Sequence, residues 1–205
     1  MRKPIIIVAG ALLAFSACDR GGSNHVDILP VHADVTVDLP TAMPDQQIFL
    51  QKSALDTSIA DDLVVVDVML RSSTPVTFYD IDMELLFDPG LVEVSRLEWS
   101  MTPLGDCTDT VAACPLYCTT NVSSSGTTPP GDLILGIPTE SCSPGATITG
   151  TVRLFSIWFI AASAGSSQLT LVDGPGSGDC EILDANRNPL AIQCFSGNAT
   201  ITAAR

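Results

Sequence analysis

A strict alternation of apolar and polar side chains over residues 80–87 constrains the fold of this chain more than any other feature. The apolar members are Ile81, Met83, Leu85 and Phe87, and the positions between them hold Asp80, Asp82, Glu84 and Leu86. A period of two places successive side chains on opposite faces of a β-strand. We therefore expect a strand with the apolar set in a hydrophobic core and Asp80, Asp82 and Glu84 together on one solvent-facing side.

β-branched and aromatic residues recur in short runs along the rest of the chain, with Gly, Pro, Asn and Asp between them. Such runs are typical of strands. They predict strands over residues 47–52, 63–70, 76–87, 91–99, 132–138, 147–161, 168–172 and 197–203, and a hairpin over residues 180–194. No segment shows a helical period that is capped at both ends. The pattern predicts an all-β fold, an antiparallel sandwich of about nine strands.

The N-terminus has the composition of an export signal. Arg2 and Lys3 precede an apolar run over residues 5–15, which is too short to span a bilayer comfortably, and small residues follow it. The Phe-Ser-Ala-Cys stretch that ends at Cys18 resembles the lipobox of bacterial lipoproteins. That resemblance implies a signal peptide over residues 1–17 and a lipid on Cys18. An ordinary secretory signal with an incidental cysteine is the alternative.

The next segment has the composition of a linker. Residues 18–44 are rich in Gly, Ser, Asn, Asp and Pro, which suits a flexible tether, and both His25 and His32 lie in it. We expect the folded domain over residues 45–205, interrupted by a Cys-bearing insertion at about residues 101–128.

The number of cysteines supports export. Thiols of exported proteins usually pair in disulfides, and once Cys18 is set aside for the lipid, six of the seven cysteines remain, an even number that can pair. Cys180 and Cys194 lie at equal distances from Arg187, the centre of the expected hairpin, so a disulfide between them is predicted. The other four are expected to form two disulfides, with the pairing left open; they are Cys107, Cys114, Cys118 and Cys142. A metal site at Cys114 and Cys118 is the competing interpretation, but the second pair of ligands that it requires is missing.

Composition excludes several function classes. The net charge is −14, and removing residues 1–17 leaves 7 basic against 23 acidic side chains, a charge near −16 that repels nucleic acid. Two histidines, and Lys52 as the one lysine beyond the signal, leave little for acid–base catalysis, so we expect no enzyme. Asp184, Asn186 and Asn188 have the spacing of calcium ligands, but Pro189 replaces the glycine of such loops, which favours a plain turn over a calcium site.

The order of the elements resembles that of cohesin modules. The resemblance rests on residues 62–70, on residues 79–94 with their Phe-Asp-Pro-Gly turn, and on residues 131–136, 150–159, 184–189 and 197–201, so that it covers residues 47–203. It implies a jelly-roll β-sandwich that binds dockerin modules through one sheet face. Carried onto this chain, the third-strand part of that face consists of Asp80, Asp82 and Glu84.

These features lead to three hypotheses. The first is a lipid-anchored, exported, non-catalytic module, periplasmic or on the cell surface, that recruits a dockerin-type protein in polysaccharide degradation. The second is a carbohydrate-binding module, which stacks sugars on aromatic rings; the candidate rings are Tyr79, Trp99, Tyr117 and Trp158. The third is a structural lipoprotein of the envelope with no separate ligand.

Overall fold

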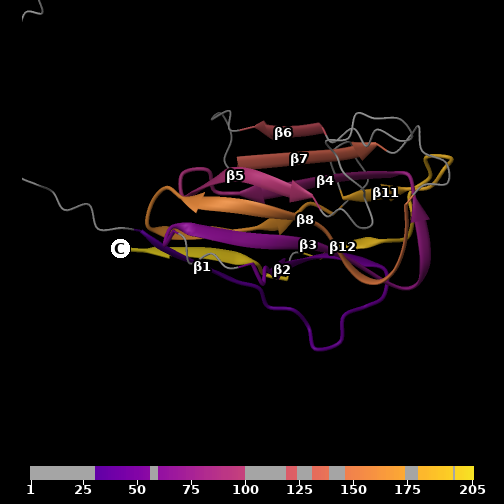
Figure 1. Ribbon diagram of the computed structural model, residues 1–205, viewed down its shortest axis with the longest axis horizontal. Coiled ribbons are helices and arrows are strands. Elements are labelled where there is room, and N and C mark those ends of the chain that lie inside the picture. Colours follow the sequence, from indigo (N-terminus) through magenta and orange to yellow (C-terminus); the bar gives the residue numbers. More distant parts are fainter. Residues whose placement is uncertain are drawn as a thin grey trace, which may run out of the picture.

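The computed structural model describes residues 31–55, 60–99, 119–123, 131–138, 146–173, 180–195 and 197–205, and every element in these ranges is a β-strand. At residues 99, 119–123, 132 and 134–138 it describes the backbone alone. Figure 1 shows β6, β7 and β4 in the upper part of the view and β3, β2 and β1 in the lower part. Within these ranges no helix is long and apolar enough to cross a membrane.

The first large sheet, called here the β3–β8 sheet, has the strand order β12-β2-β3-β8-β5. Its strands are β2 (Gln47–Lys52), β3 (Leu63–Phe78), β5 (Val92–Trp99), β8 (Ala146–Ala161) and β12 (Gln193–Phe195). The two 16-residue strands β3 and β8 form its centre and pair antiparallel along almost their whole length. β12 runs parallel to β2 and is the exception to the expected antiparallel pairing.

The second large sheet, called here the β4 sheet, has the order β10-β4-β7-β6, and β11 also pairs with β4. Its strands are β4 (Asp80–Phe87), β6 (Thr119–Ser123), β7 (Gly131–Pro138), β10 (Thr170–Leu171) and β11 (Glu181–Leu183). β4 begins two residues after β3 ends, so Tyr79 alone separates strands that lie in different sheets.

A smaller sheet joins the two ends of the described chain, in the order β1-β13-β9. Its strands are β1 (His32–Thr36), β9 (Gly165–Gln168) and β13 (Thr200–Ala204). The expected tether over residues 18–44 is therefore wrong from His32 onward. Ala33 and Val35 are buried in the core, because β1 pairs with the last strand of the fold, a partner that no local sequence signal reveals.

One hydrophobic core lies between the sheets, which makes the fold a jelly-roll β-sandwich. The inner side chains of β3 are Val64, Val66, Val68 and Leu70, and β8 contributes Phe155, Ile157 and Phe159 opposite three of them. The rings of Phe87 on β4 and Phe159 on β8 meet edge to face across the core, with centroids 5.7 Å apart. Each fully buried side chain of this kind stabilises the fold by about 1.5–3 kcal/mol.

The predicted strands are found, and several end or divide differently. The run predicted over residues 76–87 is divided at Tyr79 between β3 and β4, and the run over residues 168–172 overlaps two short strands, β9 and β10. β1 and β6 were not expected, and β6 lies inside the predicted insertion over residues 101–128. The predicted break between residues 70 and 76 is absent, because β3 runs without interruption from Leu63 to Phe78. The remaining differences are shifts of a few residues at strand ends.

The predicted hairpin over residues 180–194 is wrong, although the predicted disulfide is present. β11 pairs with β4 and β12 pairs with β2, so the two halves belong to different sheets. The chain folds back on itself only around the turn, where Leu183 faces Pro189. Cys180, directly before β11, is bonded to Cys194 of β12 with their Cα atoms 6.1 Å apart. The bond therefore cross-links the two large sheets.

Replacing both bonded cysteines with alanine tests this cross-link. The sequence separation of 14 closes a loop whose constraint on the unfolded chain is worth about 3 kcal/mol. We expect the double variant Cys180→Ala/Cys194→Ala to lose about that much free energy of unfolding in urea titrations of the oxidised protein. The other cysteines stay in place in both proteins, so an equal midpoint for variant and wild type would contradict a stabilising role.

Candidate functional site

The side chains of β4 divide between two faces as the alternation predicts. The inward set is buried in the core, each member no more than 3% exposed: Ile81, Met83, Leu85 and Phe87. Asp80, Asp82 and Glu84 lie on the opposite side, which we call the acidic face, and Asp82 and Glu84 are partly exposed. β7 covers one edge of β4, and β11 and β10 share the other edge, so this face is the outer side of a continuous sheet.

Asp80 departs from the expected solvent-facing position, because only 9% of it is exposed. β11 lies alongside this end of β4 (Figure 1), with Leu183 opposite Asp80 in the register. Leu183 is itself buried without joining the core cluster. The backbone N–H of Tyr79 donates to the carbonyl of Leu183 at 2.9 Å, which fixes β11 at this position. The cover thus comes from a strand a hundred residues further along the chain.

The turn after β11 forms the wall of a small hollow beside Asp80. The backbone N–H groups of Asn186 and Asn188 donate to Oδ1 of Asp184 at 2.7 and 2.8 Å, and Nδ2 of Asn188 donates to Oδ2 at 3.1 Å. These bonds lower the pKa of the Asp184 carboxyl, and they hold the turn in one shape. The hollow measures about 210 Å³ and is lined by Tyr79, Asp80, Asp184, Ala185 and Arg187.

The electrostatics of this end of the acidic face are unusual. Burial, and then the neighbouring charge of Asp82, raise the pKa of Asp80 to about 6, while the backbone N–H of Ile81 and then the charge of Arg187 act in the opposite direction. Burial also raises the pKa of Asp82, again opposed by Arg187. Oδ1 of Asp80 is buried and accepts no hydrogen bond from any described group. A buried acceptor without a donor is destabilising and uncommon in folded proteins. In the described part of the chain, Oε1 of Gln47 and Nε1 of Trp158 are also buried without a partner, but neither belongs to a residue that lines the hollow.

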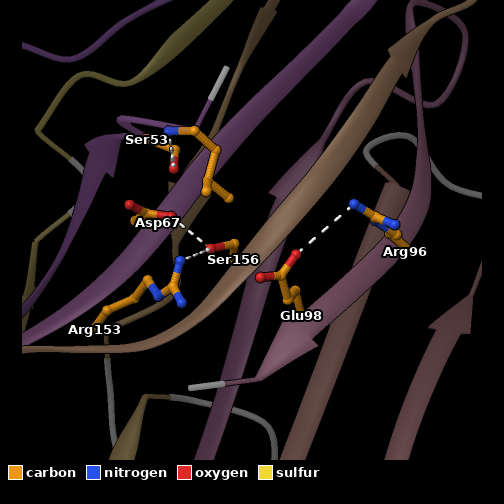
Figure 2. Close-up of polar contacts among 7 residues, drawn as sticks. Ser53, Asp67, Arg96, Glu98, Arg153 and Ser156 are labelled. Atoms are coloured by element: carbon orange, nitrogen blue, oxygen red, sulfur yellow. Dashed lines mark hydrogen bonds and ion pairs between the residues drawn. The ribbon is translucent and has the colours of Figure 1, made fainter. Parts of the chain in front are cut away.

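The outer side of the β3–β8 sheet holds a polar group that the sequence analysis missed. Ser156 donates from Oγ to Oδ1 of Asp67 at 2.6 Å, and Nη1 of Arg153 donates to the same Oγ at 3.2 Å (Figure 2). Ser156 is fully buried and Asp67 is 7% exposed. The available signal was one polar residue inside each of two apolar runs, Asp67 among valines and Ser156 among aromatic residues.

Trp158 lies on this same outer side but is not an exposed platform. It is 9% exposed, and the guanidinium carbon of Arg96 lies 3.7 Å from its ring centroid, the geometry of a cation–π contact. Figure 2 shows Arg96 extending toward Glu98 on the same strand, with a nitrogen–oxygen distance of 3.8 Å. Among the other candidate rings, Tyr79 borders the hollow, whereas Tyr117 and the side chain of Trp99 lie outside what the structure describes.

Several predicted sites fall outside the described residues. They are the lipidation site Cys18 and the insertion cysteines Cys107, Cys114, Cys118 and Cys142. In the described ranges no group of three or more His, Cys, Asp or Glu side chains is arranged to hold a metal ion. Asp184 and Asn188, considered above as calcium ligands, bond to each other within the turn.

Comparison with known proteins identifies the fold. No protein-family model matches the sequence. No curated protein matches it either. The fold is similar to the OlpC cohesin of a type I cohesin–dockerin complex from Clostridium thermocellum, at 12% identity, covering 77% of this chain and 94% of that one with a TM-score of 0.52.

Two further structures agree. The sixth cohesin of scaffoldin B from Acetivibrio cellulolyticus, solved with a dockerin, has 14% identity, covers 74% of this chain and 95% of its own, and gives a TM-score of 0.51. The solution structure of CaCohA2 from Clostridium acetobutylicum has 17% identity, covers 83% and 90%, and gives a TM-score of 0.50. The chain therefore has a cohesin-like fold.

The raised pKa of Asp80 predicts a specific pH dependence of stability. The folded state, with a pKa of about 6, binds the proton more tightly than an unfolded chain, whose Asp pKa is near 3.9. The contribution of this group to the free energy of unfolding is therefore largest below about pH 4 and is lost as the pH rises through 6. We expect Asp80→Asn to become more stable relative to wild type between pH 4 and pH 7, by on the order of 1–2 kcal/mol.

Urea unfolding of both proteins at several pH values measures this difference. Asp38→Asn, which replaces an exposed carboxylate after β1, serves as the matched control. A difference between Asp80→Asn and wild type that stays constant from pH 4 to pH 7 would show that the Asp80 carboxyl does not titrate in this range.

Proposed function

We propose that this chain is an exported, non-catalytic binding module that recruits a protein partner of the dockerin type, and that the acidic face of β4 holds the partner. The observation that carries the proposal is the position of Asp80, Asp82 and Glu84 on the outer side of one sheet of a cohesin-like fold, with Asp82 and Glu84 partly exposed and Asp80 buried at one end. Two of the similar structures were solved as complexes with dockerins. A role in polysaccharide degradation belongs to the same proposal.

The charge of this face favours a partner that presents Lys or Arg. Glu181 of β11 lies opposite Asp82 in the register, so it adds a fourth carboxylate to the three on β4. The whole chain carries a net charge of −14. Charge complementarity of this kind accelerates association and selects against acidic competitors more than it raises affinity.

Asp80 supplies directional recognition in addition to charge. Its buried Oδ1 lacks a donor in the free protein. A partner N–H that displaces the groups around this atom makes the hydrogen bond that folding leaves unmade, and hydrogen bonds to charged groups are worth about 1.5–3 kcal/mol.

The side chains present argue against catalysis. Of the two histidines, His32 is an exposed residue of β1 in the small terminal sheet. The one described serine that bonds to a buried carboxylate, Ser156, is itself fully buried, so a substrate does not reach its hydroxyl. A nucleophile requires both an activating base and access to substrate.

Membrane attachment through Cys18 is part of the proposal. The signal-like residues 1–17 and the lipobox resemblance support it. The sequence suggested a linker of 27 residues, from Cys18 to Pro44. Because β1 already begins at His32, the linker between the lipid and the fold is shorter than that.

The geometry gives less support to carbohydrate binding. A sugar-stacking platform needs an aromatic face open to solvent. Arg96 occupies the face of Trp158, and the acidic face places carboxylates on its outward positions where a platform would have rings.

Quantitative binding tests the acidic face. The mature chain with Cys18→Ser is used to capture a partner from the extracellular fraction of the source organism, and the captured protein is then purified and measured by surface plasmon resonance. We expect the triple variant Asp80→Asn/Asp82→Asn/Glu84→Gln to bind at least about tenfold more weakly, mainly through slower association at low salt.

The control for this experiment removes the same charge elsewhere. Asp38, Asp61 and Glu93 are exposed and lie outside the β4 sheet, so their triple amide variant should bind as wild type does. Equal binding by both triple variants would overturn the acidic face as the binding site. A source genome that encodes no dockerin would count against a dockerin partner and favour a structural role in the envelope.

Intact-mass measurement of the membrane fraction tests the lipid anchor. We expect a mature N-terminus at Cys18 with a diacylglyceryl adduct, and we expect Cys18→Ser to abolish both the adduct and the membrane association. An unmodified Cys18 in the membrane fraction would exclude the anchor.

A further inference from the structure

Arg187 occupies a fixed position at the tip of the turn that follows β11. Its backbone has a φ of 62°, in the left-handed region, and its N–H donates to the carbonyl of Asp184 at 3.0 Å. The same turn is closed by the bonds from Asn186 and Asn188 to the Asp184 carboxylate. The residue itself is exposed. The backbone of the turn is thus held in place, while the long side chain extends at the protein surface.

This side chain lies beside the buried end of the acidic face. Arg187 lines the same hollow as Asp80, and its charge acts on both Asp80 and Asp82. Yet Oδ1 of Asp80, in a residue that is nine-tenths buried, receives no hydrogen bond from any described group. Arg187 therefore balances the charge of the pair without satisfying this oxygen.

The hollow has room and chemistry for a second cationic group. Its volume of about 210 Å³ exceeds that of several water molecules, enough for the end of a side chain. The charged residues that line it are Asp80, Asp184 and Arg187, and Tyr79 borders it. Asp82 is the next outward residue of β4 after Asp80. Carboxylates outnumber cations in this lining, and Oδ1 of Asp80 accepts no hydrogen bond from any described group.

We propose that this hollow binds a basic side chain of the partner, an arginine or a lysine. In the free protein Arg187 supplies the positive charge at this position, and the incoming side chain displaces it. The proposal rests on the proposed function, because it names the residue type that anchors the partner on the acidic face. Arg187 is exposed, and the interactions of an exposed charge are screened by water and contribute little stability, so displacing Arg187 opposes binding only weakly. A cation that takes the place of Arg187 balances the charges of Asp80 and Asp82 in its stead, and it donates in addition to Oδ1 of Asp80.

Titration with arginine amide, with lysine amide for comparison, tests the site without the partner. The carboxyl ¹³C resonances of Asp80 and Asp82 and the Nε resonance of Arg187 are followed by NMR in the mature chain with Cys18→Ser. We expect both carboxyl resonances to shift, and the Arg187 Nε resonance to move toward its solvent-exposed value as its place is taken. Citrulline amide, which has the same shape without the charge, should leave all three unchanged.

Two variants distinguish displacement from general charge attraction. Arg187→Gln should bind arginine amide about two- to fivefold more tightly, since no internal cation competes. It should also raise the pKa of Asp80 further, because Arg187 lowers it. Arg205→Gln removes the same charge from the exposed residue after β13 and should bind as wild type does. Equal affinities for the two variants, or an Nε resonance of Arg187 that stays still while Asp80 responds, would overturn the proposal.

The outcome is separable from that of the proposed function. A partner that binds through the acidic face with equal affinity to wild type and Arg187→Gln leaves the proposed function standing and overturns the displacement. Arginine amide that displaces Arg187, in a protein whose partner is unaffected by the triple amide variant, shows a cation site but overturns both the acidic face as the binding surface and a side chain of the partner as the occupant of the hollow.

Discussion

The pairing of β3 with β8 is the constraint on which the rest of the structure depends. Their inward side chains, with Val64 opposite Phe159 and Val66 opposite Ile157, form one wall of the core, and β2 and β5 pair along the outer edges of the two strands. β3 also sets the position of the candidate site, because it ends at Phe78 and β4 starts at Asp80. Only one residue connects β3 in one sheet to β4 in the other, so the end of β3 largely determines where β4 begins. Asp80 is therefore placed by the packing of Phe78.

This placement has a consequence for the chemistry of Asp80. The residue is at the corner where the two sheets diverge, and β11 covers the corner with Leu183. A carboxylate in such a place is destabilising, as its raised pKa records. A neutral side chain at this position would make the free protein more stable. Opposite effects of one residue on stability and on binding are typical of functional sites, where an interaction left unmade in the free protein becomes available to a ligand.

The sequence predicts the parts of this fold that local periodicity determines, and misses the parts that depend on distant partners. The alternation in β4 identified both its core side chains and its acidic face, because period two is a property of eight consecutive residues. The burial of Asp80 was not predictable in this way, since Leu183 lies far along the chain. β1 was not predicted for the same reason, because its partner is the distant strand β13. Two apolar residues, Ala33 and Val35, do not make a recognisable strand pattern in a polar segment. On the β3–β8 sheet, the hydrogen bond between Asp67 and Ser156 could not be predicted either, because it depends on the register that makes the two residues neighbours.

The disulfide shows how a correct pairing can follow from an incorrect local structure. Symmetry about Arg187 suggested two strands of one hairpin, whereas Cys180 and Cys194 belong to segments that join different sheets. The cross-linked arrangement has a physical advantage that a hairpin lacks. β11 and β12 have three residues each, too few to hold their positions by ladder bonds alone, and the segment between them carries Asp184 and Arg187. Joining its two ends across the sandwich fixes the wall of the hollow to both sheets, so that the cation beside Asp80 is positioned by the covalent framework as well as by hydrogen bonds.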